Sequence, residues 1–335
     1  MLRKGNVSFI MLLVLIPLCV GINFSEAKTT TIKFSSPFPA SDPRTQSYQY
    51  WGDLVNKETE GRVKVVIFPG GSLIPLKEHY HAISRGSIGG GLLISSFLDP
   101  IIPELVVTSL AGTIPVHEPK EVLKVEKEIK PIMNKIFEKH GIKYLFATYE
   151  GEICFIVRKG KDPITKVADL KGLKMRDAGK YTSIFLRDLG VSTVTLGISQ
   201  VVTALQYGTV DGVMFNWLTA QGIKAADVAP SLTYLGFYGT WVFTGMNLDM
   251  FKGLSSGDQQ ILMQAAEKAA EYSVKQGEKA RDDFFANPGG FKIYYLPKEE
   301  LQKLLKALHE VKEEILKKTP PSGKELAQAL EKAAR

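Results

Sequence analysis

The stretch from Ser256 to Ala286 is the feature that most restricts how this 335-residue chain can fold. It contains no proline, is rich in Ala, Gln, Glu and Lys, and is followed by Asn-Pro-Gly at residues 287–289, which are strong helix-forming and helix-stopping signals. At about 1.5 Å of rise per residue, a helix of this length would run roughly 45 Å, which is longer than one small lobe. The sequence therefore predicts a helix that lies across two lobes.

Short apolar runs typical of β-strands recur along the rest of the chain, and amphipathic stretches typical of helices lie between them. The expected strands span residues 31–35, 63–68, 91–95, 143–149, 153–158, 212–215 and 291–296. The clearest further helices are expected at 46–59, 119–140 and 181–189. Strands that alternate with helices favour an α/β architecture with a largely parallel sheet.

The N-terminus has the layout of a secretory signal peptide. Arg3 and Lys4 provide a short positive region, residues 7–22 are apolar, and Ser25 and Ala27 are the small residues expected before a cleavage point. We therefore predict that the chain is cleaved after Ala27, that residues 1–27 are removed, and that the mature protein is periplasmic.

A retained membrane anchor and a lipid anchor are the two other interpretations of this segment. The apolar stretch is shorter than the roughly 20 residues that span a bilayer, which disfavours the membrane anchor. A lipid could be attached at Cys19, but the bulky Leu18 before it is unfavourable for lipoprotein processing. A cleaved signal peptide remains the preferred interpretation.

Charge and cysteine content restrict the function further. The chain has 42 Lys and Arg against 35 Asp and Glu, a formal net charge of +7, and loss of residues 1–27 lowers this by one. Many of the lysines alternate with glutamates in the helical C-terminal sequence, which is typical of a solvated helix face rather than of a nucleic-acid-binding stripe. Cys154 is the one cysteine after residue 27, so an intramolecular disulfide cannot form there.

Two segments of the chain echo each other, AISRGSIGG at residues 82–90 and ALQYGTVDG at residues 204–212. Both have the pattern of a helix end, a glycine suited to the left-handed cap conformation, a short turn and an apolar strand. The echo is either common to any helix–strand unit with a glycine cap or the mark of two similar lobes around a shared cleft. Because ligands bind beyond the carboxyl ends of strands in open α/β sheets, the second interpretation nominates residues 94–96 and 215–217.

Motifs of well-known catalytic chemistry are missing from the sequence. It contains no Gly-x-Ser-x-Gly elbow, no Walker phosphate loop, no Gly-x-Gly-x-x-Gly and no Cys-x-x-Cys. His79 and His81 are two residues apart and would point about 200° from each other on a helix, so they cannot share a metal ion. Cys154 lies in an apolar run, which indicates a buried structural thiol. The sequence therefore predicts neither an enzyme nor a metal or cofactor site.

One arginine is a candidate for ligand binding. The run DLKGLKMR at residues 169–176 predicts a helix end, a glycine turn and a short strand that finishes in Arg176. An arginine at the end of an inner strand presents a planar, permanently charged fork that suits a carboxylate. A surface ion pair is the alternative role for such an arginine.

Residues 163–176 and 204–212 together resemble the two ordered signature motifs of the solute-binding subunits of tripartite ATP-independent periplasmic (TRAP) transporters. The run FPGGSL at residues 68–73 resembles the loop after the second strand of that family. The resemblance covers essentially the whole chain after residue 27. It implies a two-lobed fold that closes around its ligand by a hinge, a substrate carboxylate bound by Arg176, and a further contact near Phe215 and Asn216.

The chain also departs from the pattern of that family. Some members carry a second arginine at the position that corresponds to Phe155 here. Charged groups that sugar-acid binders carry on the strand after Gly89 are replaced by Leu93, Ile94 and Ser95. With one cation among aromatic and apolar side chains, the pocket is expected to suit a monocarboxylate with an apolar tail rather than a dicarboxylate or a sugar acid.

The sequence therefore predicts a two-lobed α/β periplasmic solute-binding protein in which the long helix crosses both lobes. Lobe I is expected to comprise residues 28–152 and 242–281, and lobe II residues 153–241 and 282–335. The expected partners are a small organic acid and the subunits of a TRAP membrane permease, and a ligand-sensing periplasmic module for a membrane receptor is the alternative function. The expected substrate-binding residues are Arg176, Asn216, Phe215, Trp217, Phe155, Phe38, Ser95 and Tyr238.

Overall fold

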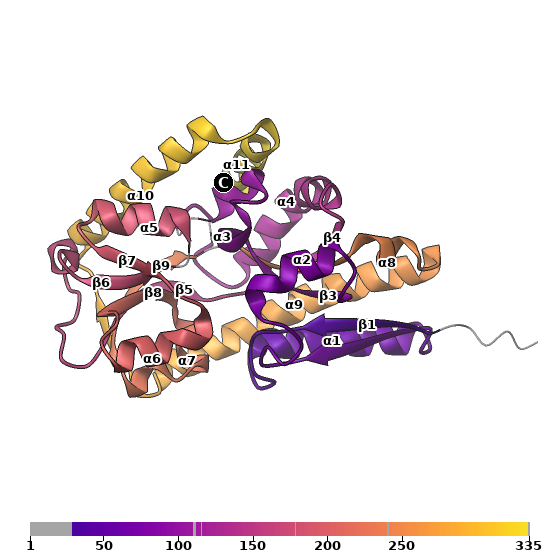
Figure 1. Cartoon of the computed structure of the whole chain (residues 1–335), viewed down its shortest axis with the longest axis horizontal. Coiled ribbons are helices and arrows are strands. Elements are labelled where there is room, and N and C mark those ends of the chain that lie inside the picture. The colour runs from indigo at the N-terminus through magenta and orange to yellow at the C-terminus, as the bar shows by residue number, and fades with distance from the viewer. Residues whose placement is uncertain (1–28, 110–111, 115, 178, 240, 334–335) are drawn as a thin grey trace, which may run out of the picture.

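Two mixed β-sheets, each covered by helices, form the two lobes of the protein in the computed structural model (Figure 1). The structure describes residues 29–109, 112–114, 116–177, 179–239 and 241–333, so the predicted signal peptide, residues 1–27, lies outside the described residues. The predicted two-lobed α/β fold is confirmed.

The sheet of lobe I combines the N-terminal part of the chain with one strand that returns from lobe II. Its strands are β1 (Thr30–Ser35), β2 (Val63–Phe68), β3 (Gly90–Ile94), β4 (Ile142–Ala147) and β10 (Val242–Asn247). They pair in the order β2-β1-β3-β10-β4. The helices of this lobe are α1 (Pro43–Glu58), α2 (His79–Ser84), α3 (Ser95–Leu98), α4 (Glu121–Glu138) and α8 (Leu248–Lys252).

The sheet of lobe II is built from the middle of the chain and one later strand. Its strands are β5 (Glu152–Val157), β6 (Lys174–Asp177), β7 (Ser192–Thr195), β8 (Gly212–Asn216), β9 (Ser231–Tyr238) and β11 (Lys292–Tyr295). They pair in the order β11-β9-β5-β8-β6-β7. The helices of this lobe are α5 (Lys180–Asp188), α6 (Val201–Gln206), α7 (Trp217–Gly222) and α10 (Lys298–Lys318).

Both sheets are mixed, which corrects the expectation of a largely parallel sheet. In lobe I, β1 is parallel to β2 and β3, but β10 is antiparallel to β3 and β4. In lobe II, β6 is parallel to β7 and β8, but β5 is antiparallel to β8 and β9. The chain crosses between the lobes from β4 to β5 and from β9 to β10. A strand that enters a lobe from the cleft must run opposite to the strands that point toward the cleft, and this is why β5 and β10 are antiparallel to their neighbours.

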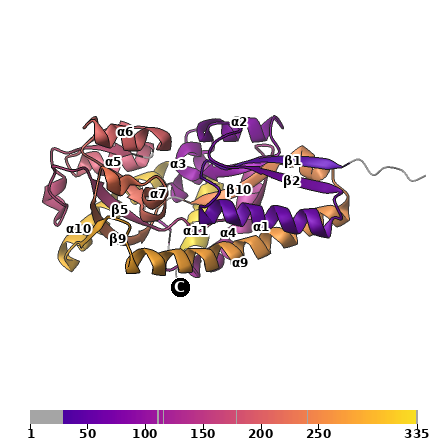
Figure 2. The ribbon, with the colours of Figure 1, turned by 90° about the horizontal axis from the view of Figure 1, so that it is seen from below.

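The long helix predicted from the sequence is confirmed with the expected bounds. Helix α9 (Ser256–Ala286) runs along both lobes, as Figure 2 shows. Near its start, the Trp51 indole of α1 donates a hydrogen bond to the carbonyl oxygen of Leu262, at 3.3 Å. Near its end, the Phe284 ring stacks on the Trp217 ring of α7, with ring centres 4.7 Å apart. One helix therefore ties the two lobes together.

The C-terminal helix returns to lobe I, although the predicted division assigned all of residues 282–335 to lobe II. Helix α11 (Pro321–Ala333) packs against α4, where its Leu326 and Leu330 side chains are buried. The ammonium of Lys332 also lies 2.7 Å from a carboxylate oxygen of Glu128 on α4. None of the described helices is both long enough and apolar enough to cross a membrane.

Candidate binding site

A cavity lies between the lobes, at the ends of strands from both sheets. Lobe I lines it with Phe38, Ile94 and Phe97, and lobe II lines it with Arg176 and Phe215, among other residues. The space inside that atoms do not occupy is about 670 Å³, counted with its opening to solvent.

The two echoing segments, residues 82–90 and 204–212, each lead into a strand whose end lines this cavity. Helix α2 ends before Gly86, whose φ is +72°, and the chain continues into β3 and α3. Helix α6 ends before Gly208, whose φ is +70°, and the chain continues into β8 and α7. Ile94 at the end of β3 and Asn216 at the end of β8 both line the cavity. This arrangement agrees with the interpretation of the echo as two similar lobes around one cleft.

Arg176 lies near the end of β6 and is only 1% exposed. Its Nε–H donates to the carbonyl oxygen of Leu196 at 3.0 Å, and its guanidinium carbon lies 4.9 Å from the centre of the Phe215 ring. Nη1 has no hydrogen-bond partner among the described residues, and none of their carboxylates forms an ion pair with this guanidinium. Burial lowers the pKa of Arg176 to about 10, against an opposing effect of the neighbouring Asp177. The Arg176 guanidinium is therefore a buried donor with unused capacity to bind an anion.

Asn216 supplies a neutral polar group to the same cavity. It is the last residue of β8 and caps α7, because its Oδ1 accepts a hydrogen bond from the Thr219 N–H at 2.8 Å. With the oxygen used in this way, the amide NH₂ is the group of Asn216 that can donate to a ligand.

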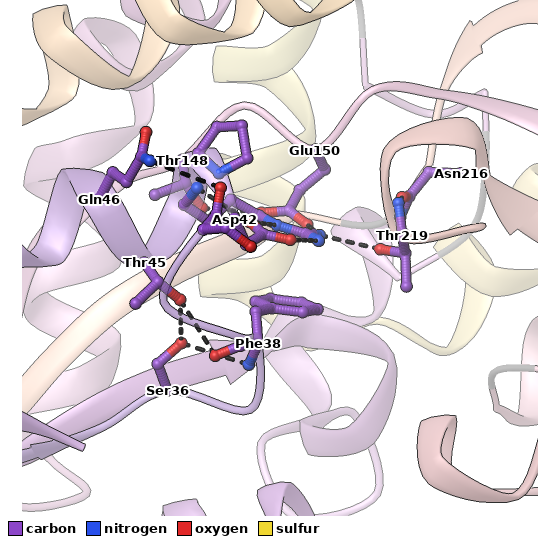
Figure 3. A network of polar contacts seen from close by, with 12 residues as sticks. Ser36, Phe38, Asp42, Thr45, Gln46, Thr148, Glu150, Asn216 and Thr219 are labelled. Carbon is purple, nitrogen blue, oxygen red and sulfur yellow. Dashed lines mark hydrogen bonds and ion pairs between the residues drawn. The ribbon is translucent and has the colours of Figure 1, made fainter. Parts of the chain in front are cut away.

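A second arginine, Arg44, contacts three residues that line the cavity, Phe38, Glu150 and Thr219. Figure 3 shows this network of charged and polar side chains. Arg44 donates from Nε to Asp42 Oδ1 at 2.8 Å and from Nη2 to Asp42 Oδ2 at 2.7 Å. Its Nη1 donates to Glu150 Oε2 at 2.7 Å and to Thr219 Oγ1 at 2.8 Å. The guanidinium carbon also lies 3.4 Å from the centre of the Phe38 ring. Arg44 belongs to lobe I and Thr219 to lobe II, so this guanidinium joins the two lobes.

The remaining walls are mostly apolar. Lobe I contributes Phe97 and Val242, while lobe II contributes Ile153, Ile198 and Met214. Side chains of this kind exclude water and favour an apolar portion of a ligand at about 25 cal/mol per Å² of buried apolar area.

The structure brings together four of the eight residues expected to bind the substrate. Arg176, Asn216, Phe215 and Phe38 all line the cavity. Trp217 does not, because its indole N–H turns away to donate to Glu152 Oε2 at 2.7 Å and its ring packs on α9.

Three further expected residues also lie outside the cavity lining. The Tyr238 hydroxyl is buried and donates to the carbonyl oxygen of Thr148 at 3.0 Å. The Ser95 hydroxyl is buried and accepts from Thr108 Oγ1 at 2.8 Å. Phe155 is buried in the core of lobe II, and Ile153, two residues earlier on β5, lines the cavity instead. Because β5 is antiparallel to β8, the cleft end of β5 is its beginning, where Ile153 pairs with Asn216.

Sequence reasoning missed the residues that reach the cavity from irregular segments. Glu150 lies in the crossing from β4 to β5, and Phe97 lies in the short helix after β3. A local signal exists for Asp42 and Pro43, which have the pattern of an N-cap followed by proline at the first helical position. That pattern marks the start of α1, and it does not indicate that Arg44 reaches the cleft.

A comparison with known families gives an independent view of the chain. A family model described as bacterial extracellular solute-binding protein, family 7, matches residues 34–319. A solute-binding protein of Albidiferax ferrireducens is 23% identical over 262 residues, which cover 76% of this chain and 76% of the relative. The ectoine-binding periplasmic protein TeaA of Halomonas elongata is 26% identical over 70% of this chain and 68% of the relative.

Solved structures share the fold. A TRAP periplasmic solute binding protein of Desulfovibrio salexigens with bound orotic acid superposes with a TM-score of 0.82, at 20% sequence identity. The match covers 91% of this chain and 99% of that protein. The similarity therefore extends over both lobes.

Proposed function

The chain belongs to family 7 of the bacterial extracellular solute-binding proteins, and from this premise we propose that it captures a small monocarboxylate with an apolar tail and delivers it to a TRAP-type membrane permease. Proteins of this family bind solutes for transport and catalyse no reaction. The ligands named for the two relatives above, ectoine and orotic acid, differ from each other, so the ligand class is inferred from the cavity of this chain.

The observation that carries this proposal is the charge pattern of the cavity. Among the described residues that line it, Arg176 is the one cation and Glu150 the one anion. Glu150 is already bonded to Arg44, whereas Arg176 has no paired carboxylate. One ligand carboxylate would neutralise Arg176. A second carboxylate would lie unpaired among apolar walls, at a cost of several kcal/mol.

Hinge closure is the second part of the proposal. The Arg44–Thr219 hydrogen bond joins the lobes beside the cavity, and it would break if the lobes moved apart. The Arg44 bonds to Asp42 would persist, because both residues belong to lobe I. We infer that Arg44 is held ready in the open form and bonds to Thr219 when the lobes close around a ligand.

A thermal-shift screen tests the ligand class. Branched or aromatic monocarboxylates, including 2-oxo and 2-hydroxy acids, should raise the melting temperature by several degrees, because binding at about 100 times Kd adds about 2.7 kcal/mol of stability. Succinate, malate and uronic acids should leave it nearly unchanged. Ile153→Arg adds a second cation to the cavity, and this variant should gain a response to succinate. If succinate or a uronic acid stabilises the unaltered protein most, the proposed ligand class is wrong.

A further inference from the structure

Glu150 is a buried carboxylate at the cavity for which capture of a monocarboxylate provides no role. It lies in the crossing between β4 and β5, is 3% exposed, and lines the cavity. Its Oε1 accepts from Thr148 Oγ1 at 2.7 Å, and its Oε2 accepts from Arg44 Nη1 at 2.7 Å. Each carboxylate oxygen has two lone pairs, so both oxygens can accept another hydrogen bond.

The cluster around Glu150 holds more negative than positive charge. Arg44 binds Asp42 through two parallel hydrogen bonds, the geometry of a complete arginine–carboxylate pair. Glu150 shares the same guanidinium through one hydrogen bond, so two buried carboxylates are matched by one cation. Burial raises the pKa of Glu150, and Arg44 opposes this effect. Of the two carboxylates, Glu150 is the one that lines the cavity and the one that is less completely paired.

The cavity is therefore polarised, with an unpaired cation at one wall and an excess of negative charge at another. Arg176 lies on β6 of lobe II, whereas Glu150 and Thr219 both bind Arg44 at the junction of the lobes. Figure 3 shows Glu150 and Thr219 in this network. The amide oxygen of Asn216 already accepts from the Thr219 N–H and is uncharged, so it is a weaker acceptor than the Glu150 carboxylate for a charged N–H group. Apolar side chains such as Ile153 and Met214 also line the space.

We propose that Glu150 binds a positively charged N–H group of the ligand while Arg176 binds its carboxylate, so that the ligand is a small zwitterion with an apolar body, such as an apolar amino acid or a cyclic imino acid. This inference rests on the proposed function and sharpens its ligand class. A zwitterion supplies one charge to each wall and leaves neither Arg176 nor Glu150 unmatched. A simple monocarboxylate neutralises Arg176 alone.

Matched pairs of probes test the proposal by calorimetry with the full mature chain. The pairs are L-proline and cyclopentanecarboxylate, L-valine and isovalerate, and L-phenylalanine and hydrocinnamate. In each pair the carboxylate and the apolar body are retained, and only the charged nitrogen is lost. The zwitterion of at least one pair should bind about 10- to 100-fold more tightly than its partner, as expected for one charged hydrogen bond.

Glu150→Gln keeps the shape and an acceptor oxygen but removes the charge. It should lower the affinity for the preferred zwitterion by about 10-fold or more and leave the affinity for its monoanionic partner unchanged or higher. The matched control is Glu152→Gln, which alters a buried carboxylate two residues away that binds Trp217 and does not line the cavity. It should leave the preference within each pair as it is in the unaltered protein.

The outcomes separate this inference from the proposed function. Zwitterion binding that depends on both Arg176 and Glu150 supports both. If the monoanions bind as tightly as the zwitterions and depend on Arg176 alone, the role of Glu150 is wrong and the proposed function stands. If no member of any pair binds, the size and charge that we assign to the cavity are wrong, and both proposals fall.

Discussion

Two arginines at the cleft are equally buried but differ in their hydrogen-bond and ion-pair partners. Arg44 and Arg176 are each 1% exposed. Arg44 is enclosed by hydrogen bonds to Asp42, Glu150 and Thr219. Arg176 has one hydrogen bond, to the carbonyl oxygen of Leu196, and no paired carboxylate among the described residues.

The pKa values express the same contrast. Burial lowers the pKa of both groups, but for Arg44 the attraction of Asp42 and Glu150 exceeds this effect and the pKa is raised. For Arg176 only Asp177 opposes burial, and the pKa falls to about 10. A buried cation that the protein has neutralised serves the structure, whereas we propose that one left without a carboxylate binds an anion from outside.

The largest expected effect contrasts the stabilities of two matched variants. Arg44→Met leaves the buried carboxylates of Asp42 and Glu150 without their cation, so the free energy of unfolding should fall by about 3–5 kcal/mol. Arg176→Met removes a buried charge that has no partner, so the free energy of unfolding of the ligand-free protein should be unchanged or should rise by up to about 2 kcal/mol. Urea unfolding of the two variants measures both values.

The comparison of the two arginines requires that Arg44→Met lowers the free energy of unfolding and that Arg176→Met does not. Dialysis from denaturant must precede the measurement, because a co-purified ligand would stabilise the unaltered protein and obscure the gain in Arg176→Met. A loss of several kcal/mol in Arg176→Met after this treatment would mean that the guanidinium holds the fold together and is not reserved for a ligand.

A smaller effect is expected from the hydrogen bond that joins the lobes. Thr219→Val keeps the shape of the side chain and removes the hydroxyl that accepts from Arg44. One net hydrogen bond of about 0.5–1.5 kcal/mol corresponds to a roughly 2- to 12-fold loss of affinity, mainly through faster ligand release. Surface plasmon resonance would measure the dissociation rate. Thr203→Val, at an exposed position of α6, is the control. Equal ligand dissociation rates in Thr219→Val and Thr203→Val would contradict the proposed role of Arg44 in closure.

The sequence was sufficient to predict those parts of the fold that depend on local signals. The bounds of α9 follow from a run of helix-forming residues that ends at Asn-Pro-Gly, and β2 (Val63–Phe68) was predicted to the residue. Arg176 was found because it ends a recognisable motif. These signals lie within a few residues of the feature that they specify.

The rest of the site depends on contacts between distant parts of the chain. The antiparallel direction of β5 decides that Ile153 rather than Phe155 reaches the cavity, and nothing in the sequence of that strand states its direction. Arg44 binds Glu150 and Thr219, which lie 106 and 175 positions further along the chain. No local sequence pattern therefore predicts this network. Each of these features could be identified only from the folded structure.

The most direct test of the central claim is calorimetric titration of three proteins with the carboxylate that gives the largest thermal shift. Arg176→Ala should lower the affinity by about 10- to 150-fold, because a charged hydrogen bond is worth roughly 1.5–3 kcal/mol. Arg176→Lys should lower it clearly but less, because lysine keeps the charge and loses the two-pronged geometry. Circular dichroism should show all three folds intact. An unchanged affinity in Arg176→Ala would contradict the assignment of Arg176 as the carboxylate-binding residue of this cavity.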